Sequence, residues 1–466
     1  MDNRSALILW LVVWAVMMII VTNAQWSRKN PSVGLPVSYL FSLSMLHWFG
    51  GLIYTFPWYT PKHPYLTQSG VSLENVSAGF LESAYGVVGF AIGSSLLAPW
   101  LINTIKPAWI IDNFTYQPNL KLPKTYLTLG LTFYFVLSPI SGIIPSLGSV
   151  ISSGLSLLII GLCLGCWKSW VLGDRKAFLG WLSFAIFMPI ITITTQGFIG
   201  YGSAAASVVL LFVISFYKPR WQIVVSAALA IIFGLSVFVT YMRDRGVIRA
   251  SVWGGQDLES RIDRFTKTFT EFEIFDPFKQ DHLEAIDGRL NQNFLVGKAV
   301  LYMQDTKKDF ANGETIWQAA IGPIPRLLWP DKPAVGGSGN IVTTYTGIPF
   351  AAGTSVGVGQ VLEFYINFGT PGVIIGFTIF GTIIRILDMA AGQRLVSGNW
   401  VGFTSWFLPA LALMQPGGAL IEVVTTFSAA TVLVFILNKT YLPKAKRMPN
   451  YPPQYSQYYP EEFPEQ

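Results

Sequence analysis

Apolar runs of about twenty residues, the length at which a helix crosses the hydrocarbon core of a bilayer, recur along most of the chain. A helix suits that environment because it satisfies its backbone hydrogen bonds internally. The pattern predicts about eleven membrane-spanning helices, at residues 6–22, 36–56, 79–101, 125–143, 147–167, 178–196, 201–217, 222–241, 364–386, 401–415 and 419–438. We therefore expect an all-α polytopic membrane protein.

The basic residues of the short connections predict an orientation. Arg28 and Lys29 follow the first span, the next connection holds only Lys62, and basic and bare connections continue to alternate along the chain. Cytoplasmic connections of membrane proteins are enriched in Lys and Arg. The alternation therefore predicts a periplasmic N-terminus, a periplasmic loop after Tyr241 and a cytoplasmic tail from Lys439 onward.

One long polar stretch interrupts the apolar pattern and divides the chain into four parts. We expect spans one to eight in residues 1–241, a large periplasmic loop in 242–355, spans nine to eleven in 356–440, and a disordered cytoplasmic tail in 441–466. Mixed charges at helical spacing in the first half of the loop are typical of amphipathic helices on a bilayer surface. Insertions of this length usually carry function, so we expect the active-site segment there.

Composition narrows the chemistry that the chain can perform. It is 52% hydrophobic and 12% charged, and the net charge of +6 lies in short membrane connections, where topology explains it better than nucleic-acid binding does. Cys163 and Cys166 lie in an apolar run, as small residues on a helix face, and the chain has only three histidines. We expect no metal and no other cofactor, so any chemistry must rest on arginines and carboxylates.

The segment around Arg326 concentrates groups that are capable of chemistry. An unpaired charge in an apolar run is costly, so Arg326 should have an anionic partner. That partner is either Asp331 or Glu314, in a structural ion pair, or a bound anion. Asp331 and Lys332 lie between prolines that stiffen the turn, and glycines such as Gly337 allow backbone N–H groups to approach an anion.

A second cluster of positive charge, Arg243, Arg245 and Arg249, follows the eighth predicted span. Positive charge on the expected periplasmic side is contrary to the topological trend. These arginines either reach lipid headgroups beside Asp244 or clamp a phosphate or pyrophosphate, which guanidinium groups bind through paired hydrogen bonds.

Glu363 stands at the start of the ninth predicted span. It is either a carboxylate stabilised by the helix dipole or a general base whose proton affinity is set by an apolar interface. Glu82 and Glu422 begin other spans in a similar way, with less weight as candidates. We interpret His282 as a surface histidine rather than a catalyst.

Two motifs carry a resemblance to a known family. The first is Pro-Arg-Leu-Leu-Trp-Pro-Asp-Lys-Pro, which contains Arg326 and is followed by Gly337, and the second is Glu-Phe-Tyr-Ile-Asn-Phe-Gly-Thr-Pro-Gly, which begins at Glu363. Together with the long outer loop, they resemble the Wzy-type O-antigen and exopolysaccharide repeat-unit polymerases, also described as oligosaccharide repeat unit polymerases. The likeness covers the hydropathy layout throughout but specific residues only in residues 321–372.

That resemblance implies a glycosyltransferase of the bacterial inner membrane with a GT-C-like architecture. Undecaprenyl pyrophosphate carries the growing glycan, which the enzyme transfers to the next lipid-linked repeat unit, and a chain-length regulator and a flippase are the implied partners. The implied catalytic residues are Arg326, Glu363 as the first choice of base and Asp331 as the second. The implied substrate-binding residues are Arg243, Arg245, Arg249, Lys332, Gly337, Trp329 and Tyr365.

Three other functions remain open. An O-antigen ligase is less favoured because the His-Asn/Ser-x-x-Leu loop of ligases has no good counterpart here. A flippase or transporter of lipid-linked sugars typically has internal repeats and charged or broken helices near the bilayer midplane, whereas the charges noted here crowd into one loop. A non-catalytic subunit of a polysaccharide export system would need no essential arginine.

Overall fold

The computed structural model describes residues 2–26, 31–107, 110, 114–140, 148–217, 221–326, 328–333, 337–351, 354, 356–442 and 446–447. These residues are almost wholly helical, and the strand pairing in this part of the chain joins Tyr116–Gln117 (β1) to Lys446–Arg447 (β2). The predicted all-α class is confirmed. Of the tail predicted to be disordered, residues 441–466, the structure describes only 441–442 and 446–447, and the others lie outside the described part.

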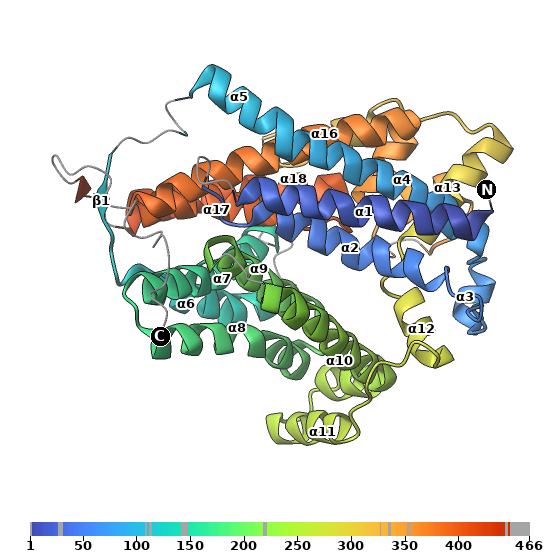
Figure 1. Cartoon of the computed structure of the whole chain (residues 1–466), viewed down its shortest axis with the longest axis horizontal. Coiled ribbons are helices and arrows are strands. Elements are labelled where there is room, and N and C mark those ends of the chain that lie inside the picture. Colours follow the sequence, from blue (N-terminus) through green and yellow to red (C-terminus); the bar gives the residue numbers. More distant parts are fainter. Residues whose placement is uncertain are drawn as a thin grey trace.

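The long helices form a bundle (Figure 1). They are α1 (Asn3–Gln25), α2 (Leu35–Ile53), α4 (Leu73–Ile92) with a π-helical turn leading into α5 (Ala98–Ile105), α6 (Leu122–Thr132), α7 (Gly148–Val171), α8 (Arg175–Gln196), α9 (Gly200–Tyr217), α10 (Trp221–Trp253), α16 (Gln360–Val396), α17 (Trp400–Ala412) and α18 (Leu420–Thr440). Shorter helices lie between them: α3 (Pro64–Gln68), α11 (Leu258–Thr270), α12 (Gln280–Asp287), α13 (Asn293–Thr306), α14 (Glu314–Ile321) and α15 (Ser338–Thr346).

Each predicted apolar run overlaps at least one of these helices, and residues 141–143 and 147 of the predicted runs lie outside the described part. Within the described residues, seven helices are long and apolar enough to cross a membrane: α1, α4 continued by α5, α7, α8, α9, α16 and α18. Their outer faces present large apolar side chains, as Ile8, Val12 and Ile19 do on α1. Such faces fit a lipid environment better than water, so the chain has the character of a membrane-embedded protein.

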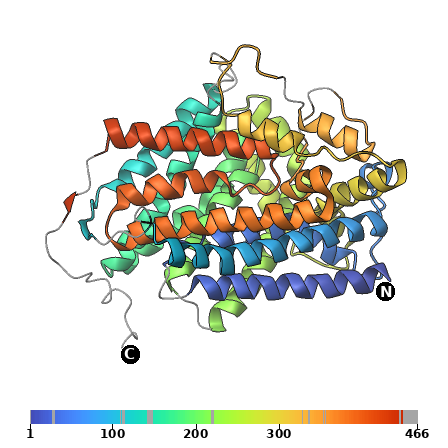
Figure 2. The ribbon, with the colours of Figure 1, turned by 90° about the horizontal axis from the view of Figure 1, so that it is seen from above.

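The helices run side by side along one direction. Figure 2 shows α18, α17, α16, α4 and α1 in that order, and these neighbours are packed against one another. The N-terminus, α3, α12 and α13 lie at one end of the bundle, and β1 lies at the other (Figure 1). The first residues and much of the long loop therefore share an end of the bundle.

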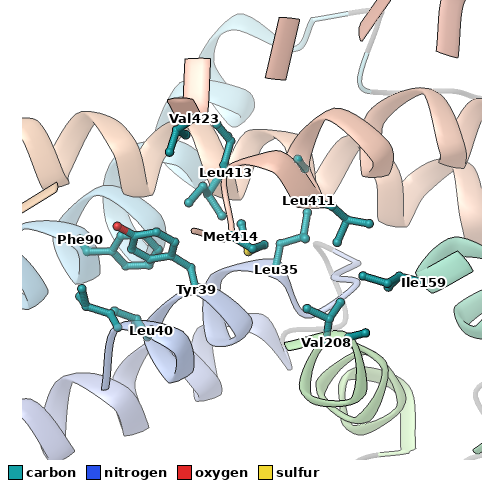
Figure 3. Close-up of a cluster of buried hydrophobic side chains, with 14 of the residues drawn as sticks. Leu35, Tyr39, Leu40, Phe90, Ile159, Val208, Leu411, Leu413, Met414 and Val423 are labelled. Carbon is teal, nitrogen blue, oxygen red and sulfur yellow. The ribbon is translucent and has the colours of Figure 1, made fainter. Parts of the chain in front are cut away.

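The core of the bundle is apolar where residues of α2, α4, α7, α9, α17 and α18 meet (Figure 3). Tyr39 of α2 stacks on Phe90 of α4, with the ring centroids 4.9 Å apart. The hydroxyl of Tyr39 donates to the side chain of Gln360 at the start of α16. This hydrogen bond gives the one polar atom of a fully buried ring a partner, as burial requires.

Part of the long loop is packed inside the bundle rather than on its surface. Helix α13 presents Val296, Val300 and Met303 at helical spacing and packs them against α4. The two helices cross where both carry a glycine: a Cβ at Gly79 would lie 1.9 Å from the carbonyl oxygen of Asn293. Surface amphipathic helices were predicted only from the earlier part of the loop, and the sequence analysis did not single out α13.

The close crossing of α4 and α13 predicts an intolerant position. Gly79→Ala should force the helices apart and lower the stability by about 1–3 kcal/mol, because the methyl group would overlap a backbone carbonyl that has no room to yield. The thermal unfolding temperature of the purified protein in detergent measures this loss. Gly180→Ala on α8 is the matched control, since no atom lies within 4 Å of its added Cβ, and equal behaviour of the two variants would contradict the prediction.

Candidate functional site

A cavity of about 640 Å³ lies at the end of the bundle that holds the long loop. It is lined by residues 239–245 of α10, by α12 and by α3 with the residues around them. The lining residues are His63, Tyr65, Leu66, Val239, Met242, Arg243, Arg245, Glu273, Lys279, Asp281, His282, Glu284, Ala285, Gly288 and Arg289. Its volume is in the range of ordinary ligand sites, and its walls are strongly charged.

An extended strip of loop after α11 brings Glu273 to the cavity. The strip runs back along α10, where Thr240 and Glu273 exchange hydrogen bonds through the threonine hydroxyl, and the backbone N–H of Phe275 donates to the Ser236 hydroxyl at 2.9 Å. Hydroxyls on the helix thus provide hydrogen bonds for backbone groups of a segment that belongs to no helix or strand. This arrangement fixes the position of the Glu273 side chain.

Glu273 is the centre of a charge cluster in the cavity wall. It accepts hydrogen bonds from Arg243 at 2.7 Å, from His282 Nε2 at 2.9 Å and from Lys279. The three donors, with Lys279 the largest influence, lower the pKa of this carboxyl to about 2. Glu273 is therefore a carboxylate at neutral pH and serves to neutralise cations.

The interpretation of His282 as a surface residue was wrong, because its side chain is buried. The backbone N–H of Asp276 donates to Nδ1 of this histidine at 3.1 Å, so its Nε2 carries the hydrogen that is donated to Glu273. Both ring nitrogens are engaged within the protein. In this arrangement the histidine positions the loop and has no nitrogen free for a substrate.

Arg243 is neutralised by neighbouring acids, but two other arginines of the cavity are not. Arg243 pairs with Asp244 and Glu273. Arg245 and Arg289 both line the cavity, and neither has a carboxylate within 4 Å among the described residues. The positive charges of Arg289 and Arg249 act on Arg245, and its side chain has the side chain of Tyr241 as a hydrogen-bond partner. The cavity therefore holds positive charge in excess of what its own acids balance.

Helix α12 is held in place by buried and half-buried carboxylates. Asp287 accepts hydrogen bonds from the hydroxyls of Tyr54 and Tyr59 at 2.7 and 2.6 Å and from the Asn291 amide at 2.6 Å. Burial raises the pKa of Asp287. Glu284 accepts from two backbone N–H groups of the segment before α3. These contacts set the distance between α12 and the end of α2 and so shape the cavity.

Arg249 lies on a different surface from the cavity. Its guanidinium stacks over the rings of Phe198 and Trp253, at 4.1 and 5.4 Å from their centroids, and its Nε donates to the carbonyl of Gly197. Stacking of this kind stabilises a cation without an anion. Of the three arginines expected to act together, the structure brings Arg243 and Arg245 to the cavity but places Arg249 beside α8.

The segment around Arg326 is exposed, and its cationic side chains donate hydrogen bonds to backbone carbonyls of the same segment. Nη1 of Arg326 donates to the carbonyl of Lys332 at 2.9 Å, and Nζ of Lys332 donates to the carbonyls of Gly322 and Ile324. Neither Asp331 nor Glu314 pairs with this arginine within the described residues. Asp331, Trp329 and Gly337 lie in the same segment, and the segment does not contribute to the cavity lining.

Glu363 is only 1% exposed. Its Oε2 accepts the backbone N–H of Leu420 at 2.7 Å, at the start of α18, and its side chain also receives the Thr315 hydroxyl. Tyr365, two residues later, is buried with its ring 6.4 Å from that of Phe310. Neither residue lines the cavity. A role for Glu363 in proton transfer thus requires a conformation in which α14 moves away from it.

Sequence reasoning did not find Arg289, Glu273 or the residues that support α12. Arg289 follows α12 at a turn, where a lone arginine carries no recognisable pattern, and only the folded chain brings it to Arg245. Within the described residues, no three His, Cys, Asp or Glu side chains gather in a way that could hold a metal ion.

One family matches this chain: a domain of unknown function (DUF8712) covers residues 113–441. The match includes the end of α10, the loop strip with Glu273, α12 and the segment around Arg326. No curated protein and no solved structure matches the chain.

The depressed pKa of Glu273 predicts acid sensitivity of the cavity wall. A carboxylate with a lowered pKa stabilises the fold fully above its unfolded pKa of about 4.3, and this contribution is lost as the pH falls toward about 2. Screening by solvent limits the effect to about 1 kcal/mol or less. Thermal unfolding at about pH 7 and pH 3 should therefore show a larger drop for wild type than for Glu273→Gln. Identical drops would contradict the assigned role.

Proposed function

The chain belongs to the DUF8712 family, and from the residues of its outer loop we propose that it is a membrane glycosyltransferase. It would polymerise lipid-linked oligosaccharide repeat units in a bacterial inner membrane, moving a glycan from undecaprenyl pyrophosphate to the sugar of an acceptor unit. The observation that carries the proposal is the cavity in which Arg245 and Arg289 have no carboxylate partner. The resemblance of residues 321–372 to repeat-unit polymerases supports the choice of reaction.

The two arginines without a carboxylate partner could bind the leaving group of this reaction. An acceptor hydroxyl attacks the anomeric carbon of the donor, the bond from that carbon to the pyrophosphate oxygen breaks, and the pyrophosphate leaves with its negative charge. Fixed guanidinium groups stabilise that developing charge without a metal. Arg245 and Arg289 supply two such groups, with Lys279 and Arg243 beside them and already paired to Glu273.

The attacking hydroxyl must also give its proton to a base. Of the carboxylates in the cavity wall, Glu273 and Glu284 are engaged by hydrogen bonds, whereas Asp281 has no hydrogen bond or ion pair in the part of the chain that is described. Asp281 is therefore added to Glu363 and Asp331 as a candidate base. Arg326, on an exposed segment that does not line the cavity, remains a candidate catalytic cation, and Lys332 of the same segment remains a candidate for substrate binding.

The proposal includes a topology. Eleven spans would place the N-terminus and the loop with its cavity on the periplasmic side, and the C-terminus in the cytoplasm. The shared end of the N-terminus, α12 and α13 supports this arrangement. A lipid-linked donor would then reach the cavity from the outer leaflet, after a flippase has delivered it, and a chain-length regulator would act on the product.

A second candidate function, transport of lipid-linked sugars, is favoured by one observation. Charged groups are not confined to the loop: Arg385 and Asp388 pair within the bundle, both almost fully buried, and α16 is broken at Phe368 and Gly369. Broken helices and buried charges are features of transporters. The polymerase remains preferred because the unbalanced arginines lie in the cavity at the end of the bundle.

The arginine pair gives the first functional test. In a host that lacks the gene, Arg245→Ala and Arg289→Ala should each lower the yield of long glycan chains about a hundredfold or more, because the pyrophosphate loses a fixed cation. Gel analysis of the surface glycan, with membrane levels matched, measures the effect. Arg175→Ala, an exposed arginine that does not line the cavity, should behave as wild type.

The outcomes of this test separate the candidate functions. Accumulation of single repeat units on lipid in the deletion strain and in both cavity variants supports polymerisation. Long chains in the cavity variants would refute the proposed role of the cavity. Units trapped on the cytoplasmic side would favour transport, and chains of unchanged length in Arg326→Ala as well would favour a non-catalytic subunit.

Glu363→Gln tests the first of the two base candidates that the sequence offered. The amide oxygen of glutamine can still accept the N–H of Leu420, so the protein should fold while proton transfer is lost. If Glu363 is the base, turnover of lipid-linked units by the purified protein should fall with donor binding retained. Normal turnover in Glu363→Gln and a loss of turnover in Asp281→Asn would assign the base to the cavity instead.

A further inference from the structure

Helix α16 consists of two halves joined at a break. Phe368 and Gly369 have non-helical backbone angles, and the φ of Gly369 is +64°, which favours glycine. Pro371 follows, and a proline in the first turn is typical of a helix start because its missing N–H has no partner there to lose. The second half therefore begins at Thr370 as a new helix.

A buried acid on α4 contacts this break. Glu82 is 6% exposed, and its Oε1 accepts the hydroxyl of Thr370 at 2.7 Å. Its Oε2 is buried and has no partner in the described part of the chain. An ionised carboxylate with one oxygen left without a donor is costly in apolar surroundings unless it binds a proton or a cation.

The long loop is fastened to the first half of α16 at the same place. The backbone N–H of Ala311 donates to the carbonyl of Ile366 at 2.8 Å, and the N–H of Gly313 donates to the side chain of Asn367 at 2.9 Å. The N–H of Ala311 thus replaces the helical donor that the Ile366 carbonyl loses at the break. A change in the angle of the break would therefore also move the loop segment around residue 312.

Few titratable groups face Glu82. Tyr365, on the first half of α16, interacts with it electrostatically, and Gln304 of α13 hydrogen-bonds that tyrosine. His47 of α2 contacts the adjacent Ser83. From α1, Trp10 packs on the ring of Tyr85, another residue of α4. Within the described residues, no lysine or arginine acts on Glu82, so no fixed positive charge offsets its ionisation.

We propose that Glu82 is a proton-binding site and that the bound proton holds the two halves of α16 in the bent arrangement. With the proton bound, the neutral carboxyl stays beside Thr370 in an apolar setting. When the proton leaves for water, the carboxylate needs further donors that the closed break does not offer, and the first half must shift to admit them. That half carries Glu363 and Tyr365, so the loop and the candidate base move together.

Two spectroscopic readouts on the full-length protein in nanodiscs test this proposal without any glycan substrate. The infrared band of a protonated carboxyl should be stronger in wild type than in Glu82→Gln, and this difference should vanish as the pH rises. A nitroxide at Phe368→Cys, in a Cys163→Ala, Cys166→Ala background, should change its mobility over the same pH interval. In Glu82→Gln the nitroxide spectrum should be independent of pH and match the low-pH spectrum of wild type.

Thr370→Val keeps the acid but removes its partner at the break. It should retain the carboxyl band while the nitroxide at position 368 becomes mobile at every pH, and it covers the case in which Glu82→Gln fails to fold. An identical carboxyl band in wild type and Glu82→Gln, or an identical pH response of the nitroxide, would overturn the proposal. If the nitroxide spectrum changes when sodium replaces choline at fixed pH, the site binds a metal cation instead of a proton. That result would also overturn the proposal.

Failure of this test would leave the proposed glycan transfer untouched, because neither readout depends on the cavity or on turnover.

Discussion

The bundle depends on carboxylates that are buried on α16 and satisfied by the ends of other helices. Oδ1 of Asp388 accepts the backbone N–H groups of Val33 and Leu35, at 2.9 and 3.1 Å, where α2 begins, and Glu363 accepts the N–H of Leu420 where α18 begins. The first N–H groups of a helix have no partner within it, and a buried carboxylate must find donors. The N–H groups supply the donors that the carboxylates need, and the carboxylates supply the acceptors that the N–H groups need. The two ends of α16 thereby fix the starting points of two distant helices.

The helices themselves were predictable because their cause is local. An apolar run of the right length is visible in a single sequence, and every predicted run overlaps a helix in the described part of the chain. The ends of the helices were less predictable. Helix α10 continues to Trp253, well past the apolar stretch, through a polar segment in which Arg243 pairs with Asp244. The break in α16 had a readable signal in Thr370 and Pro371, which is a typical helix start, but the apolar pattern on both sides obscured it.

The candidate site was only partly predictable, because its parts meet through contacts between segments far apart in sequence. Arg243 and Arg245 were found by their clustering. The difference between them, in which Glu273 neutralises Arg243 while Arg245 has no carboxylate partner among the described residues, depends on a strip of loop with no pattern of its own. Arg289 had no local signal at all. The prominent Arg326 segment, by contrast, is defined by motif, and in the structure its cations bind the carbonyls of the same turn.

The cap that Asp388 provides for α2 also has a consequence for how the protein is made. The residues that it joins are 355 and 353 positions apart, so a ribosome has already released the first helix pair into the membrane long before their partner is synthesised. During that interval the N–H groups of Val33 and Leu35 must donate their hydrogen bonds to water or to an insertion factor. Long-range contacts of this kind form late, so the final docking of α2 belongs to the end of synthesis, and truncated chains should remain substrates for membrane quality control.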